Sequence, residues 1–80
     1  MNKQRTSSTF AVFEPAVEGG FNVSFPAFPG CVTFGYTFEE AQAKAEEVLE
    51  LWIEELKSQK QKVPLYNNRP IISEVSFAAA

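Results

Sequence analysis

The sequence contains no histidine, a single cysteine and no long apolar run, and each shortage excludes a class of protein. Without histidine the chain lacks the commonest general base and the commonest metal ligand at neutral pH. The single thiol, Cys31, cannot form a disulfide within the chain, which favours the reducing cytoplasm as the compartment. No segment approaches the ~20 apolar residues of a membrane-spanning helix, so we expect no membrane association.

Basic residues are also scarce, and the formal net charge is −3. Binding to a phosphate backbone requires clustered Lys and Arg, so we expect no direct binding of nucleic acid by this chain. The local group of Lys57, Lys60 and Lys62 follows a predicted helix. Cations at that position stabilise the negative end of the helix dipole, which explains the three lysines without a phosphate site.

Aromatic residues, in contrast, are plentiful: the 80 residues include eight Phe, one Trp and two Tyr. A chain of this length forms one small domain, which we place at residues 1–80, with residues 1–8 expected to fray. Such a domain buries only ~60% of its unfolded surface. Each buried ring covers about 150–250 Å², so the aromatic residues compensate for small size and can also contact a partner subunit.

Three short segments have the pattern of β-strands and follow one another along the chain. They are residues 9–14, residues 21–25 and residues 31–36. The first is β-branched and aromatic, and the other two alternate between two faces. A Gly19-Gly20 pair separates the first two strands, and the Pro-rich turn 26–30 separates the second from the third. Short sequential strands favour an antiparallel meander.

An amphipathic helix is predicted after the third strand. Thr37-Phe38-Glu39-Glu40 is a capping box that begins the helix, and the helical pattern runs to about Gln59. One stripe of the helix is apolar and contains Ala41, Ala45, Val48, Leu49, Trp52 and Leu56. Leu51 and Ile53 lie on opposite flanks of this stripe and widen it. The widening indicates either packing by the C-terminal segment or a subunit contact, and the pattern does not separate the two.

A fourth strand is predicted at Ile71 to Phe77, which gives the element order β-β-β-α-β. The helix then acts as a right-handed crossover that returns the chain parallel to the first strand. We therefore expect an α+β fold with a four-stranded mixed sheet of order 3-2-1-4 and one helix packed on one face. The other face stays uncovered, with Ala11, Phe13, Cys31 and Ile72 on or near it, so we predict a homo-oligomer.

No residues are arranged as a catalyst, a metal site or a cofactor site. The helix glutamates fall mostly on its solvent side; they are Glu46, Glu47, Glu50, Glu54 and Glu55. Cys31 has no evident base beside it, which indicates a buried or inert thiol. A nuclease would need several carboxylates converging on a metal pair, whereas the strands contain only Glu14 and Glu74. We expect no enzymatic activity, and a residual metal-dependent nuclease is the remote alternative.

Several short motifs, taken together, resemble the HicB-like antitoxin family. They are Phe21-Asn22-Val23-Ser24-Phe25-Pro26, Phe28-Pro29-Gly30-Cys31-Val32-Thr33, Gly35 and Thr37 before the helix, Glu39-Glu40-Ala41 with Ala45, and Leu49-Glu50-Leu51-Trp52. Each motif is weak alone, and the combination is specific. The resemblance covers about Phe10 to Glu55.

The resemblance implies a truncated ribonuclease-H-like fold without the catalytic carboxylates of that fold. It also implies an antitoxin that neutralises a small basic HicA-like toxin, which cleaves messenger RNA, and assembly as a dimer or tetramer. Many members carry a C-terminal DNA-binding domain, which we do not expect in a chain that reaches Ala80. The chain departs from the family pattern at Ala27, Tyr36 and Lys44. The alternative function is an orphan oligomeric scaffold domain without a toxin partner.

Large apolar side chains dominate the energetics of protein interfaces. On this basis we predict interface residues at Phe34, Tyr36, Leu51 and Ile53, with Trp52 as a core anchor. Core packing explains Phe34 and Trp52 equally well, and the sequence leaves that alternative open.

Overall fold

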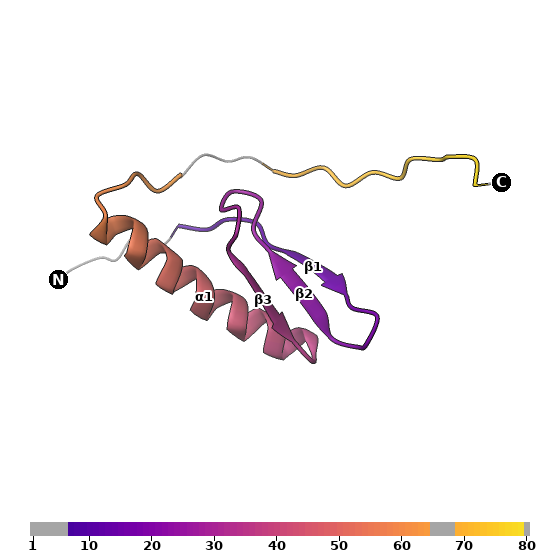
Figure 1. The fold of residues 1–80 in the computed structure, drawn as a ribbon, viewed down its shortest axis with the longest axis horizontal. Helices are drawn as coiled ribbons and strands as arrows, with labels where there is room; N and C mark the ends of the chain where they lie inside the picture. Colours follow the sequence, from indigo (N-terminus) through magenta and orange to yellow (C-terminus); the bar gives the residue numbers. More distant parts are fainter. Residues whose placement is uncertain (1–6, 65–68, 80) are drawn as a thin grey trace.

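The computed structural model describes residues 7–64 and 69–79. Its elements are the strands β1 (Val12–Pro15), β2 (Phe21–Ser24) and β3 (Val32–Gly35) and the helix α1 (Phe38–Ser58). The strands form an antiparallel sheet in the order β1-β2-β3, and α1 runs along one side of it (Figure 1). The predicted fraying of residues 1–8 falls mostly outside the described residues.

The turn between β1 and β2 depends on backbone conformations that favour glycine. Gly19 and Gly20 have φ angles of +102° and +84°. The turn is closed by two hydrogen bonds, from Ala16 N–H to Gly20 C=O at 2.9 Å and from Gly19 N–H to Ala16 C=O at 3.0 Å. The resulting register places Phe13 opposite Val23, so these two side chains share one face of the sheet.

The loop between β2 and β3 folds back into the core. Phe28 N–H donates to Phe25 C=O at 3.0 Å, and Cys31 N–H donates to Phe28 C=O at 3.0 Å. These bonds hold a compact turn around the two prolines, and all three side chains are buried. The loop therefore closes one end of the core.

The core lies between α1 and the β2–β3 part of the sheet. Its buried residues are Val23, Phe25, Phe28, Cys31, Ala41 and Ala45. The two alanines face the sheet, so the helix backbone comes close to β3: a Cβ atom on Gly35 would lie 2.5 Å from Cα of Ala41. Glycine is needed here because of this close approach. As a result α1 packs mainly on β3, and to a smaller extent on β2.

Both ends of α1 are capped, and both lie where the sequence predicts. Thr37 Oγ1 accepts a hydrogen bond from Glu40 N–H at 3.0 Å, and Glu40 Oε1 accepts one from Tyr36 N–H at 2.7 Å. At the other end Gln61 N–H donates to Leu56 C=O at 2.9 Å, with Lys60 in a left-handed conformation at φ 57°. This is a Schellman motif, which ends the helix at the C-cap Gln59.

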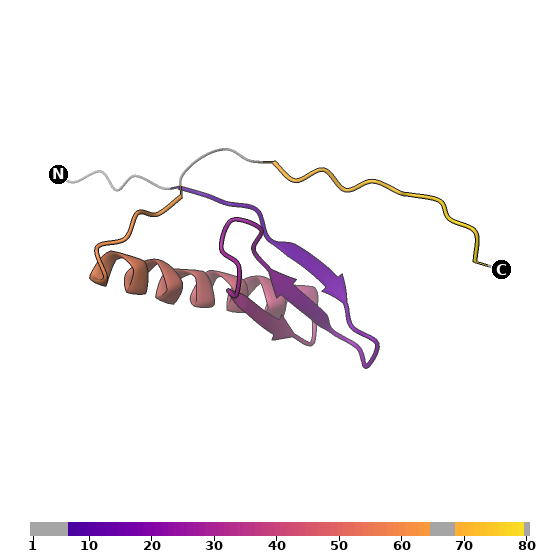
Figure 2. The same ribbon diagram turned by 45° about the horizontal axis from the view of Figure 1, so that its top comes forward.

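The expected four-stranded mixed sheet of order 3-2-1-4 is wrong. The sheet has three strands, and the described residues 69–79, which we call the C-terminal arm, form no strand. The arm is extended and runs clear of the sheet in both ribbon views (Figures 1 and 2). Its large apolar side chains, Ile71, Ile72, Val75 and Phe77, are between 81% and 90% exposed.

The position of α1 explains why the fourth strand does not form within the chain. Because the helix lies over β3 and β2, a strand added beside β1 would gain backbone hydrogen bonds but little apolar burial. Ordering seven residues costs roughly 1–2 kcal/mol for each residue, which hydrogen bonds alone do not offset. The crossover rule gives the direction of a returning strand but not the burial that it needs.

The prediction of which residues lie on the uncovered sheet face is also wrong. Cys31 is 1% exposed in the core, Ala11 and Phe13 pack against that core, and Ile72 lies in the arm. The alternation of the strands is as predicted, but in β1 and β3 the opposite set of residues faces the helix, because Gly35 contacts Ala41. The uncovered face instead carries Val12, Glu14, Asn22, Ser24, Val32 and Phe34.

Replacing Gly35 with alanine tests the close approach of β3 and α1. The added methyl group meets the backbone of Ala41, so we expect Gly35→Ala to lower the free energy of unfolding by about 1–3 kcal/mol. Urea denaturation followed by circular dichroism measures the loss. Asn22→Ala, on the exposed face of β2, is the matched control with a change within about 0.5 kcal/mol. Equal stability of Gly35→Ala and the unmodified protein would contradict the packing described.

Candidate protein-binding surfaces

Two of the predicted interface residues, Phe34 and Tyr36, form an aromatic pair on the uncovered sheet face. Their rings meet edge to face with centroids 4.9 Å apart, and Tyr36 is 74% exposed. Phe34 lies directly over Gly20, where an added Cβ atom would be 2.6 Å from Cζ of Phe34. The hairpin glycine thus supports one side of the pair, and the exposed Val32 extends the apolar surface. An exposed aromatic pair of this kind is typical of protein contacts.

The other three predicted interface residues lie in the second half of α1. Trp52 and Ile53 are partly buried against the core, and the Trp52 ring reaches the Gly30 turn. Leu51 instead is 61% exposed. The two flanks of the apolar stripe therefore differ: the Ile53 flank completes the core of the chain, and the Leu51 flank faces outward.

The five predicted interface residues do not form one patch. Phe34 faces away from α1 because its neighbour Gly35 faces the helix, whereas Leu51 lies on the helix itself. The sheet face and the outer helix flank are separate surfaces. Their roles in binding stay predictions.

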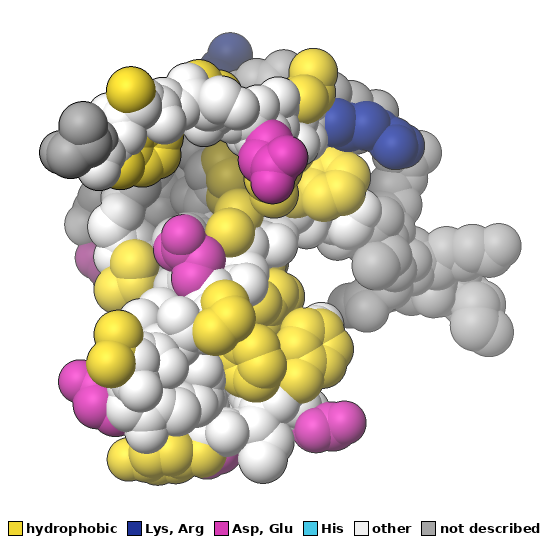
Figure 3. All heavy atoms as spheres, turned by 90° about the vertical axis from the view of Figure 1, so that its right-hand side faces the viewer, with side chains coloured by type: hydrophobic (Ala, Val, Ile, Leu, Met, Phe, Trp, Pro, Cys, Tyr) yellow, Lys and Arg dark blue, Asp and Glu magenta, His cyan; other side chains and the backbone are white. Residues whose placement is uncertain are grey.

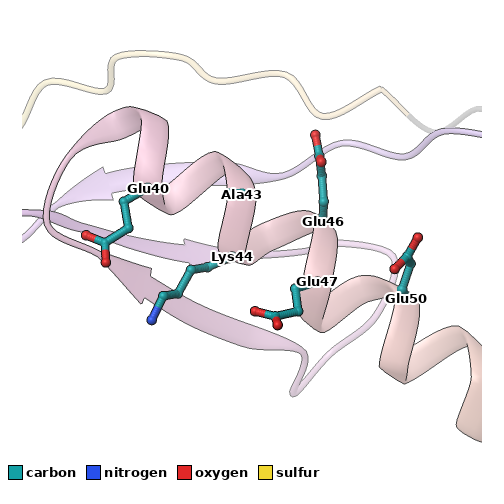
Figure 4. A pocket seen from close by; sticks show the side chains of 6 residues that line it. All are labelled: Glu40, Ala43, Lys44, Glu46, Glu47 and Glu50. Carbon is teal, nitrogen blue, oxygen red and sulfur yellow. The ribbon is translucent and has the colours of Figure 1, made fainter.

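The outer face of α1 is acidic, as the helical spacing predicts, with Glu46, Glu47, Glu50, Glu54 and Glu55 all exposed. A shallow hollow on this face is lined by Glu40, Ala43, Lys44, Glu46, Glu47 and Glu50 (Figure 4). Figure 4 shows that Glu46 and Glu50 point one way and Glu47 another, so their carboxylates do not converge. Within residues 7–64 and 69–79, no three His, Cys or acidic side chains are grouped to hold a metal ion. The face is a charged surface on which acidic side chains predominate.

An aromatic cluster at the start of α1 was not predicted from the sequence. The Phe38 ring lies 4.9 Å from the Phe13 ring and 6.1 Å from the Phe21 ring, centroid to centroid. Phe38 is about half exposed, so the cluster is partly open to solvent. Phe38 lies outside the apolar stripe of the helix, and only the alternation of β1 and β2 signals that Phe13 and Phe21 share its side.

Cys31 is the thiol of the core. It is buried among apolar residues, and this burial raises the pKa of its thiol above the ordinary value of 9.0. The thiolate is the reactive form, so both access and ionisation are reduced in the folded protein. The structure places this residue in the role of a small core side chain.

The chain matches the profile of the HicB-like antitoxin of bacterial toxin-antitoxin systems over residues 10–76. It is 40% identical over 53 residues to the UPF0150 protein ssl0259 of Synechocystis sp., covering 66% of this chain and 73% of that protein. It is 39% identical over 54 residues to the UPF0150 protein Ta0767 of Thermoplasma acidophilum, covering 68% and 78% of the two chains. No solved structure shows a significant match.

The sheet and the helix form a small α+β domain, and its polar and charged side chains lie on the surfaces described above. With the match over residues 10–76, the chain belongs to the HicB-like antitoxin family of bacterial toxin–antitoxin systems. Among the described residues, no helix has the length and apolar character to cross a membrane.

Aspartate substitutions on the two flanks of α1 distinguish surface from core. We expect Leu51→Asp to leave the free energy of unfolding within about 0.5 kcal/mol of the original, since Leu51 is exposed. Ile53→Asp places a charge against the core, and we expect a loss of about 2 kcal/mol or more. Thermal and urea unfolding measure both. Equal losses in the two variants would mean that the flanks do not differ as described.

The burial of Cys31 predicts that its thiol reacts slowly in the folded protein. We expect a thiol-specific reagent such as Ellman's reagent to label the folded protein at least tenfold more slowly than the chain unfolded in guanidinium. Because the thiol ionises more readily in the unfolded chain, stability should fall as the pH rises past about 9. A labelling rate unchanged by folding would contradict the burial of this residue.

Proposed function

We propose that the chain neutralises a HicA-like toxin, an enzyme that cleaves messenger RNA, by binding it directly. The observation that carries the proposal is membership of the HicB-like antitoxin family over most of the chain. A target of this kind acts on messenger RNA, so the site of action is the cytoplasm. In this proposal the chain contributes a binding surface, and no catalytic step is assigned to it.

The charge of the chain supports a basic partner. The chain carries a net charge of −3, and the outer face of α1 presents five exposed glutamates. A toxin that binds RNA needs a basic surface to contact phosphates. Complementary charge accelerates the encounter of two proteins and orients them, so we assign the acidic face of α1 as the surface that meets the toxin.

The apolar surfaces support self-association beside toxin binding. The uncovered sheet face carries Val32, Phe34 and Tyr36, and the outer helix flank carries Leu51. Apolar surface of this kind in a small domain marks protein contacts. We assign Phe34, Tyr36 and Leu51 to contacts between subunits, and Trp52 and Ile53 to the supporting core.

Co-expression with a HicA-like toxin protein tests neutralisation. We expect that protein to arrest growth and degrade messenger RNA when expressed alone, and co-expression of this chain to restore growth. A stable complex should co-purify. The absence of both rescue and a complex would favour the alternative of an orphan oligomeric domain without a toxin partner.

Charge reversal tests the surface that meets the toxin. We expect Glu47→Lys with Glu50→Lys to lower the association rate about tenfold or more at low salt, with a smaller effect at high salt. Glu14→Lys with Glu18→Lys is the matched control, because it makes the same change in net charge away from α1. The control should change the rate by less than about threefold. Equal effects of the two double variants would overturn the assignment of α1.

A further inference from the structure

The C-terminal arm is extended and apolar but packs on little of its own chain. A cation–π contact joins its first residue to the segment before β1, where the guanidinium carbon of Arg69 lies 5.7 Å from the ring centroid of Phe10. The arm then leaves the sheet (Figure 2). The radius of gyration is 15.5 Å, compared with about 12 Å for a compact domain of this length. Four exposed large apolar side chains in one stretch indicate a segment that binds another surface.

The free edge of β1 is a complementary feature. β1 pairs with β2 on one side, and no described strand pairs with its other side. An open edge presents unpaired backbone N–H and C=O groups to any extended chain that approaches. The partly exposed aromatic cluster of Phe13, Phe21 and Phe38 includes a side chain of this strand, Phe13.

The arm has the side-chain alternation that this edge needs. Ile71, Val75 and Phe77 fall on one face of an extended segment with Ser73, and the other face is mainly polar, with Glu74 and Ser76 beside Ile72. Beside β1, the apolar face of the arm lies on the side of Phe13, next to the open aromatic cluster. Its polar face then lies on the side of Glu14, which is exposed. The pattern is that of a half-buried strand.

We propose that the C-terminal arm of one copy pairs with the free edge of β1 in a second copy, and that the exchange is reciprocal. The chain does not complete its own sheet, because α1 covers little of the β1 side. In a pair of copies, the second copy supplies the apolar cover that a strand beside β1 lacks in a single chain. Reciprocal exchange also uses both arms and both β1 edges once, which closes this contact at two copies.

The surface involved is large enough for a stable dimer. A buried aromatic ring covers about 150–250 Å² and an aliphatic side chain covers less, so the three large apolar side chains on the apolar face of one arm bring on the order of 400 Å². Two arms, with the surfaces that they cover, bury on the order of 1,600 Å², which is within the range of standard protein interfaces. The arm of a second copy at the β1 edge therefore buries enough surface for a stable dimer. This assembly does not require a toxin, and its test is independent of toxin neutralisation.

Charge placed on one face of the arm tests the exchange. We expect the full chain to sediment as a dimer or a multiple of one, and Val75→Asp to raise the dissociation constant of the dimer at least tenfold. Val75 is exposed in the single chain, so the circular dichroism spectrum should not change. Ser76→Asp adds the same charge to the opposite face and should change the constant less than threefold. A monomeric protein, or equal effects of the two variants, would overturn the proposal.

Cross-linking of mixed chains tests the location of the contact. Glu14→Cys chains are mixed with isotope-labelled Glu74→Cys chains and treated with a short bismaleimide. The reagent does not reach Cys31, because this residue is buried. We expect the main product to join one chain of each kind, and Val75→Asp in the labelled chain to suppress it. No mixed product, or a mixed product that survives Val75→Asp, would overturn the pairing of the arm with β1.

Discussion

The contact between Gly35 and Ala41 determines the rest of the architecture. Because neither residue has a large side chain, the end of β3 and the first turns of α1 approach to backbone contact. The capping box of Thr37 and Glu40 fixes the start of the helix at the same point. The helix must then run along β3 and reach β2, and it covers little of β1, which it meets at Phe38. The open edge, the half-exposed aromatic cluster and the free arm all follow from this one close approach.

This architecture separates the surfaces that we assign to different partners. The acidic residues lie on the outer face of α1, and the Phe34–Tyr36 pair lies on the uncovered sheet face. The arm and the β1 edge lie apart from both. Figure 3 shows hydrophobic side chains exposed at the end of the molecule toward which the arm points. The two contacts that we propose, with a toxin by charge and with a second copy by strand exchange, therefore use different surfaces and do not compete. Membership of the HicB-like antitoxin family agrees with a protein that acts through its surfaces.

The sequence predicts the local elements well because their signals are local. Alternation locates three strands, the glycine pair at Gly19 and Gly20 locates a hairpin, and the capping box locates α1 to the residue. The prediction of a fourth strand was wrong for a different reason. Residues 71–77 have a strand pattern, but the pattern does not specify whether their apolar side chains would be buried beside a partner strand. The exposed and buried faces of β1 and β3 were exchanged, because the position of Gly35 against Ala41 is a tertiary contact that alternation does not encode.

Amide hydrogen exchange of the arm at two protein concentrations tests most directly the claim that a second copy completes the sheet. The account predicts that the amides of residues 71–77 are protected at high concentration and lose this protection on dilution below the dissociation constant of the dimer. The amides in the middle of α1 should stay protected at both concentrations, because they bond within the helix. Arm amides that are unprotected at every concentration, or protected equally at both, would contradict the account.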